Sequence, residues 1–297
     1  MATVNPIVDT ITGYVEEHRS ELLSKSMLDG KSRRAFNLMT DVKGPTTLNL
    51  MDTEVVFGEL QCGWNESGST EFTQRVLEPK ALSVNMAFCD KNLLKTWAQY
   101  EVKVAAGYEE LPFEEKWTSQ ILASINEKIE NMLYFGSGDD AEFKGIVPIL
   151  SAETDSVKVN AASGTSAYEF LKAVAAAIPV RVKNPVILCS MPLYREYMQD
   201  LVTANLFHYD PANGENEYRL PGTDIRVIAV DGLLNEDMEV AIAANMDNLF
   251  YGCSAEEDDN VFDLWYSKDN REFRLAVQFV AGTQIAWPGE TVLGVRA

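Results

Sequence analysis

The sequence predicts an α+β protein, and three features of its hydrophobic pattern support that prediction. Apolar residues recur at helical spacing over 112–135, which predicts one long amphipathic helix. Every odd position from Phe273 to Trp287 is apolar or threonine, which predicts an unusually long strand. Between them, residues 161–250 alternate short helices with short apolar strands, as in a compact α+β or α/β domain.

The composition is that of a soluble globular protein, with 46% hydrophobic and 24% charged residues. Its 297 residues leave room for one large or two ordinary domains. The 45 acidic and 25 basic side chains give a net charge of −20, which argues against broad attachment to nucleic-acid phosphates or to an anionic membrane. No apolar run approaches the roughly 20 residues of a membrane span, and the start MATVNPIVDT does not resemble a secretory signal.

The first 28 residues predict an amphipathic helix, with Asn5 as its cap and Pro6 at its first position. From residue 31 to residue 50 the periodicity fades, and Gly44-Pro45 interrupts the chain. We therefore expect 1–52 to form a helix and an extended arm that cannot bury itself alone. The apolar face of the helix is expected to consist of Ile7, Ile11, Tyr14, Val15, Leu22 and Leu23.

Two strands, 54–60 and 71–89, flank the polar stretch CGWNESGST. In the second strand, apolar residues at even positions from Leu82 to Phe88 alternate with polar or small ones. The pair predicts an extended hairpin loop over 53–80. A two-stranded hairpin is poorly stable alone, so it is expected to pack on another surface.

The long helix is expected to begin at Pro112 and to end at Gly136, a length of roughly 35 Å. We place it in a peripheral domain over 81–160. Its apolar face would comprise Phe113, Trp117, Ile121, Ile125, Ile129, Met132 and Leu133. Its charged side would comprise Glu114, Lys116, Glu127, Lys128 and Glu130.

Residues 161–250 are expected to form an axial domain. A helix capped by Ser166 ends at Pro179, the apolar run 185–189 is a strand, and Ser190 caps the next helix. Further strands are expected at DIRVIAV, EVAIAA and NLFYG. Residues 251–297, with the long strand, are expected to return to the sheet of the peripheral domain.

The sequence offers little from which to build an active site. It contains no GxGxxG after a strand, no GxxxxGK[ST], no GxSxG and no HExxH. The two histidines are His18, expected on the surface or in a docking contact, and His208, expected in a loop or turn. We therefore expect no enzyme, no catalytic residue and no cofactor.

Metal binding is also not expected. The acidic residues Asp139, Asp140 and Glu142, and the run 256–259, could hold calcium, but neither has the spacing of an EF-hand, and charge runs are usually solvated. The four cysteines form no CxxC pair, so free thiols in a reducing compartment are favoured over a zinc site. They are Cys62, Cys89, Cys189 and Cys253.

The order of elements, with an arm, a long hairpin, a long helix, an α/β-like domain and a long final strand, resembles the major capsid proteins of tailed bacteriophages. Their fold, the Hong Kong 97-like fold, is shared with encapsulin shells. The stretches that carry the resemblance are CGWNESGSTEFTQRVLEPKALSVNMAFCDKNLLKTW, LPFEEKWTSQILASINEKIENMLYFGSGDDAEFKGI, NPVILCSMPLYREYMQDL and FRLAVQFVAGTQIAWPGETVL. The resemblance covers about residues 40–297, and its 112–135 segment corresponds to the spine helix of the family.

The resemblance implies a structural protein that self-assembles through pentamers and hexamers into an icosahedral shell around double-stranded DNA. It implies a virion location, assembly in the host cytoplasm, a portal, and DNA enclosure without sequence-specific binding. Only about 50 residues precede the hairpin, which favours a separate scaffolding protein over a removable N-terminal segment. The hairpin tip has no Lys that could form a covalent crosslink, and the segment VQFVAGTQ of the closing strand has no acidic residue to assist one. We therefore expect the contacts between subunits to be noncovalent.

Three other functions are weighed against this one. An encapsulin-like compartment would have the same fold with an enzyme cargo inside. A cytosolic α/β enzyme would have to use His208 with the acidic run 256–259. For a tail or other virion component, the long hairpin and spine helix would be unexpected.

The residues of interest are therefore candidate contacts between subunits, since an arm and a hairpin must be covered by neighbours. For each of them, ordinary packing inside the subunit is the alternative. The candidates on the arm are Phe36, Leu38, Leu48 and Leu50, and those on the hairpin are Val55, Phe57, Trp64 and Phe72.

Overall fold

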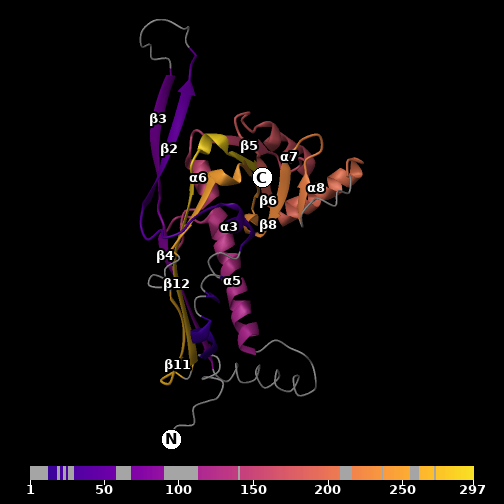
Figure 1. Cartoon of the computed structure of the whole chain (residues 1–297). Coiled ribbons are helices and arrows are strands. Elements are labelled where there is room, and N and C mark those ends of the chain that lie inside the picture. The colour runs from indigo at the N-terminus through magenta and orange to yellow at the C-terminus, as the bar shows by residue number, and fades with distance from the viewer. Residues whose placement is uncertain are drawn as a thin grey trace, which may run out of the picture.

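The computed structural model of the chain has the predicted α+β fold. Helices and strands together form the body, and one hairpin projects from it (Figure 1). The structure describes residues 13–18, 21, 22, 25, 30–57, 68–89, 113–139, 141–207, 216–235, 237–254, 261–270 and 272–297. Within these residues, no helix is long and apolar enough to span a membrane.

The first sheet is built around the long strand β12 (Glu272–Ile285). Its early part pairs antiparallel with β4 (Lys80–Cys89) on one side and with β11 (Val261–Ser267) on the other. Its late part pairs with β10 (Leu249–Cys253), which in turn pairs in parallel with β1 (Asn37–Met39). The long alternating strand predicted from residue 273 is confirmed, and it holds this sheet together.

The second sheet has the strand order β5-β13-β9-β6-β8-β7. Its strands are β5 (Val157–Ala161), β6 (Val186–Ser190), β7 (Glu217–Arg219), β8 (Arg226–Val230), β9 (Glu239–Ala244) and β13 (Val292–Arg296). The last strand, β13, pairs with β5 and β9. The final residues of the 251–297 segment thus lie in this sheet and not in the peripheral one. The sequence of β13, VLGVR, is too short to show a clear alternation of its own. It was therefore not predicted as a strand separate from the long strand before it.

Helix α5 (Phe113–Phe135) is the predicted long helix, and it runs beside the β12 sheet (Figure 1). Its buried residues Ile121, Ile125, Ile129 and Leu133 belong to one core with the inward side chains of β12, such as Leu275 and Phe279. A stripe of apolar residues at helical spacing stabilises a helix mainly through such burial, at about 25 cal/mol per Å² of apolar surface.

Two short helices and three helical turns complete this part of the chain. They are α3 (Lys31–Ala35), α6 (Ile146–Ala152), η1 (Asp231–Leu233), η2 (Met246–Asn248) and η3 (Pro288–Glu290).

Helices α7 (Ala167–Ala176) and α8 (Met191–Thr203) cover one face of the six-stranded sheet. The predicted caps are confirmed: the Glu169 N–H donates to Ser166 Oγ at 3.3 Å, and the Leu193 N–H donates to Ser190 Oγ at 3.4 Å. The other face of the sheet joins the core of α5 through side chains such as Leu188 and Ile242. The sheet is therefore covered on both faces, which is why all five residues of β6 are buried.

The turn after α5 requires two glycines because its backbone segments approach closely. The Gly145 N–H donates to the Gly136 carbonyl oxygen at 2.8 Å. A Cβ on Gly136 would lie 2.1 Å from the Phe143 carbonyl oxygen, and one on Gly145 would lie 2.6 Å from that of Tyr134. Neither distance leaves room for a side chain, so FGSG…FKGI in the sequence marks a close backbone crossing.

The segment 31–50 is not an extended arm throughout, contrary to prediction. Residues 31–35 form α3, and β1 joins the sheet beside β10. The Arg33 side chain is fully buried 3.4 Å from Glu130 of α5, and Glu130 also accepts the Ser32 N–H at 3.0 Å. Glu130, placed on the charged side of the helix by its sequence position, is thus buried as the partner of a distant arginine.

The predicted strand 71–89 is two strands, β3 (Gly68–Leu77) and β4, separated at Glu78-Pro79. Proline has no N–H for a ladder and commonly marks such a break. β3 pairs with β2 (Thr46–Val55), which begins eight residues earlier than the predicted strand at 54. Together β2 and β3 form the hairpin that projects from the body (Figure 1).

Candidate subunit interface

The projecting hairpin has two chemically different faces. In its antiparallel register Met51 lies opposite Phe72, and Val55 lies opposite Gly68. Because side chains alternate along a strand, these residues share one face, which we call the apolar face. It also carries Thr53 and Thr70, whose hydroxyls are hydrogen bonded at 3.4 Å.

Large side chains on the apolar face are exposed. The exposed fractions are 62% for Met51, 69% for Val55 and 76% for Phe72. Phe57, two residues beyond the end of β2, is 95% exposed. Phe57 and Phe72 alone present on the order of 300 Å² of apolar surface. Single exposed apolar residues are ordinary, but contiguous patches of a few hundred Å² mark interaction sites.

The opposite face changes character along the hairpin. Near the body it carries Leu48 and Leu77, both buried. Farther out it carries Asp52 directly opposite Glu71, with Glu54 next along the strand. Like charges in opposing positions destabilise a strand pair, and no Lys or Arg of the described chain lies within ion-pair distance of these carboxylates. We call this outer part the acidic face.

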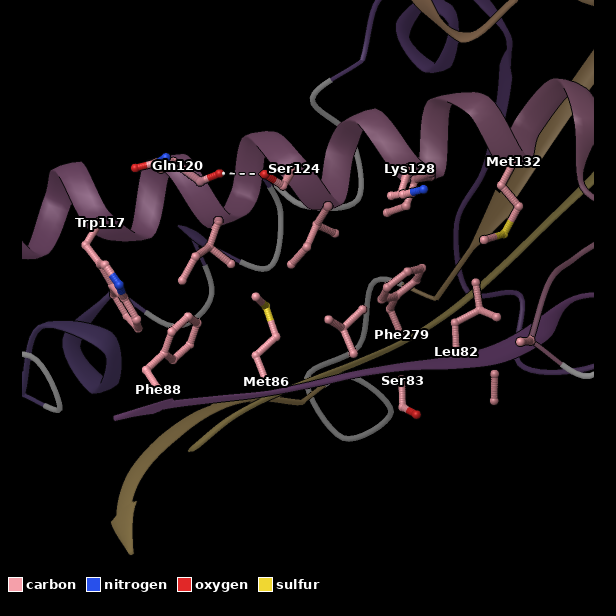
Figure 2. Close-up of a pocket in the computed structure, with 16 residues that line it drawn as sticks. Leu82, Ser83, Met86, Phe88, Trp117, Gln120, Ser124, Lys128, Met132 and Phe279 are labelled. Carbon is pink, nitrogen blue, oxygen red and sulfur yellow. Dashed lines mark hydrogen bonds between the residues drawn. The ribbon is translucent and has the colours of Figure 1, made fainter. Parts of the chain in front are cut away.

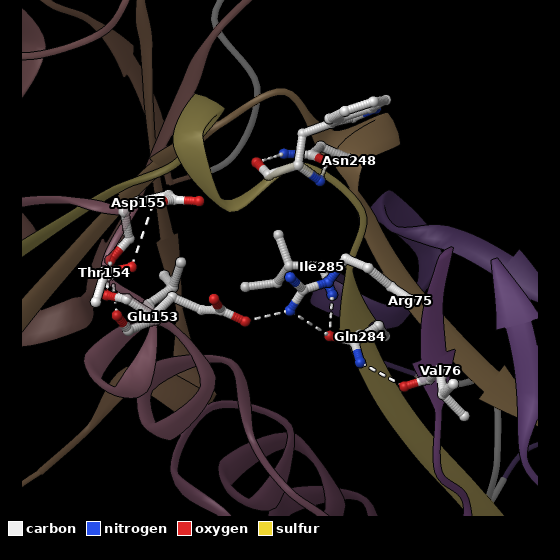
Figure 3. A network of polar contacts seen from close by, with 11 residues as sticks. Arg75, Val76, Glu153, Thr154, Asp155, Asn248, Gln284 and Ile285 are labelled. Carbon is white, nitrogen blue, oxygen red and sulfur yellow. Dashed lines mark hydrogen bonds and ion pairs between the residues drawn. The ribbon is translucent and has the colours of Figure 1, made fainter. Parts of the chain in front are cut away.

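A polar network fixes the base of the hairpin to the body, as Figure 3 shows. An Arg75 guanidinium nitrogen of β3 lies 2.5 Å from Glu153 Oε1, just after α6, and 3.4 Å from the Gln284 side chain of β12. Gln284 in turn donates to the Val76 carbonyl oxygen at 2.5 Å. Leu77 fills the space over Gly252 and Gly282, so the base combines a polar clamp with an apolar contact.

The structure separates the eight candidate contacts into groups. Val55, Phe57 and Phe72 are exposed on the hairpin, and Leu38 is 40% exposed on β1. Leu50 is half-buried. Trp64 lies outside the described residues.

Two of the arm candidates are buried in their own subunit. Phe36 is packed edge-on against Tyr134, with ring centroids 6.3 Å apart, and Leu48 is buried in the part of β2 nearest the body. Packing inside the subunit, the alternative stated for these positions, accounts for both.

Two residues that matter at this surface were not singled out from the sequence. Met51 completes the apolar face, and the alternation Met51-Thr53-Val55 could have indicated it once the strand was known to begin at Thr46. Arg75 carries no local signal, because its partners Glu153 and Gln284 are distant in sequence.

A second apolar surface lies between α5 and the face of β4 that is turned toward this helix. It is a groove of about 710 Å³ whose walls include Val84, Met86 and Phe88 of β4 and Trp117 and Ile121 of α5. Figure 2 shows Met86 and Phe88 directed toward the helix, and the Phe88 and Trp117 rings meet edge-on at 5.3 Å. Among the described strands, β4 pairs with β12 alone. The one charged side chain lining the described groove is Lys128.

Of the residues weighed for chemistry, those that the structure describes make local contacts. His18 Nδ1 lies 3.3 Å from Glu21 Oε2, an exposed contact between residues three positions apart. Glu142 accepts hydrogen bonds from the N–H and hydroxyl of Ser137, which makes it part of a turn. His208, Asp140 and 256–259 lie outside the described residues. The described residues contain no group of ligands that could hold a metal ion.

Cys89, Cys189 and Cys253 form no disulfide bond within the described part of the chain. Cys189 and Cys253 are buried, and loss of solvation raises the pKa of Cys253 to about 11 and that of Cys189 further. Both are therefore protonated and unreactive at neutral pH. Cys89 is exposed, and Cys62 lies outside the described residues.

Comparison with solved structures shows the fold. No protein-family model matches the sequence, and no curated protein matches it. The chain is similar in structure to a chain of the satellite phage P4 procapsid, with a TM-score of 0.58 at 8% identity over 94% of this chain and 98% of that one. It is also similar to a capsid chain of the native GTA particle (TM-score 0.56, 10% identity, 92% and 91% covered). A third similar chain comes from Gordonia phage Cozz (TM-score 0.58, 10% identity, 90% and 86% covered). The chain therefore has the phage major capsid fold.

Proposed function

We propose that this chain, with its phage major capsid fold, is the major capsid subunit of a tailed phage. It assembles through pentamers and hexamers into an icosahedral shell around double-stranded DNA. The observation that carries the proposal is the projecting hairpin, whose apolar face is exposed in the subunit while its base is fixed to the body. A neighbouring copy that covers this face makes the hairpin part of a closed assembly, and stability becomes a property of the shell.

The net charge of −20 agrees with a container for DNA. A shell wall that carries the charge sign of the phosphates encloses the genome without gripping it, because broad electrostatic binding to DNA requires clustered Lys and Arg. Enclosure therefore needs no sequence-specific contact. The role is structural rather than catalytic, in keeping with the capsid-like structural neighbours.

The contacts between subunits are noncovalent in this proposal. The stretch 62–70 contains no lysine for a covalent crosslink, and the segment VQFVAGTQ of the closing strand contains no acidic residue to assist one. A separate scaffolding protein and a portal complete the assembly, which takes place in the host cytoplasm and yields a virion component. The similar P4 structure is described as a procapsid that includes a size determination protein, a precedent for a separate assembly factor.

The test is light scattering and negative-stain microscopy of the purified chain, with and without co-expression of its neighbouring genes. Closed shells, or capsomers with fivefold and sixfold symmetry, are the expected result. A stable monomer or dimer under both conditions would contradict the proposal. Denaturing gels of the shells test the noncovalent part separately, since a ladder of covalent oligomers would refute it.

A further inference from the structure

We propose that the groove between α5 and β4 binds a long-chain fatty acid, with the hydrocarbon tail along the groove and the carboxylate at Lys128. The site belongs to the free subunit, so it goes beyond the proposed function and does not depend on shell formation. Three features of the groove support it, namely its apolar lining, its slender shape and its single charge.

The lining of the groove suits a hydrocarbon. Its walls include Val84, Met86 and Phe88 of β4 and Trp117 and Ile121 of α5. Figure 2 shows Met86 and Phe88 directed toward the helix, and Met86 is 38% exposed, so apolar surface meets solvent between the two elements. The volume of about 710 Å³ is that of an ordinary small-molecule site, and such sites are mostly apolar with a few polar groups. A hydrocarbon tail in the groove removes this surface from water.

The groove is long and narrow. Along α5 it extends from Trp117 to Met132, which is about 22 Å at the rise of an α-helix. A volume of about 710 Å³ spread over that length leaves room for one extended chain rather than for a compact ring system. The Phe88 and Trp117 rings, which meet edge-on at 5.3 Å, line one end. An unbranched single chain therefore fits the shape of the groove.

The single charge of the groove favours an anionic head group. Lys128 is the one charged side chain that lines the described groove, and it is exposed. No carboxylate of the described residues lies within ion-pair distance of it. Lys128 follows Gln120 and Ser124 at intervals of four residues, so the three form a polar stripe along one side of α5 (Figure 2). A carboxylate at Lys128 pairs with this cation while its tail lies on the apolar wall.

The position of Lys128 fixes the direction of the tail. Lys128 lies about 16 Å beyond Trp117 along the helix. With its carboxylate at Lys128, the acid therefore extends toward Phe88 and Trp117. A short tail leaves the aromatic end empty, and a tail longer than this distance emerges from the groove. Affinity should rise with chain length and then level off.

The first test is titration of the purified, unassembled chain with cis-parinaric acid, a fluorescent long-chain fatty acid. We expect saturable binding of one acid per chain, with quenching of tryptophan emission because Trp117 lies beside the tail. Quenching at saturation should fall markedly in Trp117→Phe but not in the matched control Trp265→Phe, since Trp265 lies on β11 away from the groove.

Two results of this titration would overturn the site. An absence of saturable binding would mean that the groove does not accept the acid, as when a protein segment fills it. Equal quenching in the Trp117→Phe variant and the unmodified chain would place the acid elsewhere on the molecule.

A series of saturated fatty acids that compete with parinaric acid tests the tail on the unmodified chain. Each added methylene should tighten binding by roughly fourfold, because each removes one further apolar group from water. The gain should stop once the tail reaches Trp117. An affinity that does not depend on chain length would overturn the assignment of the groove to the tail.

Lys128→Glu tests the head group. The variant should weaken binding of the acid by roughly tenfold, because an attractive charge pair becomes a repulsive one, and should weaken binding of the corresponding alcohol less. Lys172→Glu on α7, away from the groove, is the matched control and should bind the acid as the unmodified chain does. Equal losses for acid and alcohol would overturn the role of Lys128. All of these measurements use the free subunit, so their failure leaves the capsid function intact, and a failure to form shells leaves this site intact.

Discussion

The six-stranded sheet and the projecting hairpin are built from the same chain but are completed in different ways. β6 is buried at all five positions, with α7 and α8 on one face and the core of α5 on the other. In contrast, the first seven residues of β3 are exposed, and so are most residues of β2. Both faces of the sheet are covered within the subunit, whereas the apolar face of the hairpin is exposed. Stability of the subunit and competence for assembly should therefore be separable by mutation.

The largest expected effect is a cavity in the sheet. Ile187 is fully buried in β6 and lies between Val227 of β8 and Ala243 of β9. Ile187→Ala should lower the free energy of unfolding of the subunit by about 2–5 kcal/mol. Urea unfolding of the isolated subunit measures this. Val202→Ala, at a position 63% exposed on α8, is the control and should cost less than about 0.5 kcal/mol. Equal losses in the two variants would contradict the comparison.

A smaller effect is expected at the junction of the two regions. Arg75→Ala removes the contact with Glu153 and the clamp at the hairpin base. Both side chains are partly exposed, so the cost in unfolding free energy should be about 1 kcal/mol. Hydrogen exchange should become faster at the amides of β2 and β3 and stay unchanged in β6. Arg219→Ala breaks the exposed pair with Asp224 and serves as the control. Uniform acceleration across the subunit would show that Arg75 is not a local clamp.

A weaker effect with a defined pH dependence is expected at the end of the six-stranded sheet. Hydrogen bonds from Arg296, at 3.0 and 2.5 Å, lower the pKa of the Glu196 carboxyl below its ordinary value of 4.5. Its stabilisation is therefore present above pH 4.5 and is lost as the pH falls through the lowered pKa. The Glu196 side chain is 42% exposed, so the contribution should stay below about 1 kcal/mol.

Glu196→Gln tests this dependence by urea unfolding from pH 7 down to pH 3. The variant should be slightly less stable than the unmodified subunit at pH 7, and the difference should shrink toward the acid end. A difference that grows as the pH falls would have the wrong sign and would refute the assignment.

The smallest effect on subunit stability is expected on the apolar face of the hairpin. Phe72 is 76% exposed, so Phe72→Ser should change the unfolding free energy by less than about 0.5 kcal/mol. The same change should abolish shell formation, because an aromatic anchor at an interface often contributes 2 kcal/mol or more per contact. Microscopy and unfolding are measured on the same preparation. Thr73→Ser, on the opposite face, should leave both unchanged. Normal shells from the Phe72 variant would remove the hairpin from the interface.

The elements with local signals were predictable. The long helix ends where Gly136 follows its apolar stripe, and Ser166 and Ser190 cap the helices that they precede. Helical spacing, strand alternation and capping act within a few residues, so they can be read along the chain. The hairpin candidates Val55, Phe57 and Phe72 came from the same kind of signal, and all three are exposed.

Contacts between distant segments were not predictable in this way. Glu130 lies on the charged side of α5 by its spacing, and only folding brings it to Arg33. The split of the predicted strand at Pro79 follows from the different partners of its halves, since β3 pairs with β2 and β4 pairs with β12.

The sequence by itself determined the α+β class, the long helix, the long strand and the presence of a hairpin, because periodicity and turn chemistry are local. Only the tertiary structure decided which strands pair, that β13 closes the six-stranded sheet, and that α3 and β1 join the body. It also decided which face of the hairpin is apolar and where the groove lies. These features depend on registers and packing between residues far apart in the chain, where no single residue carries the signal.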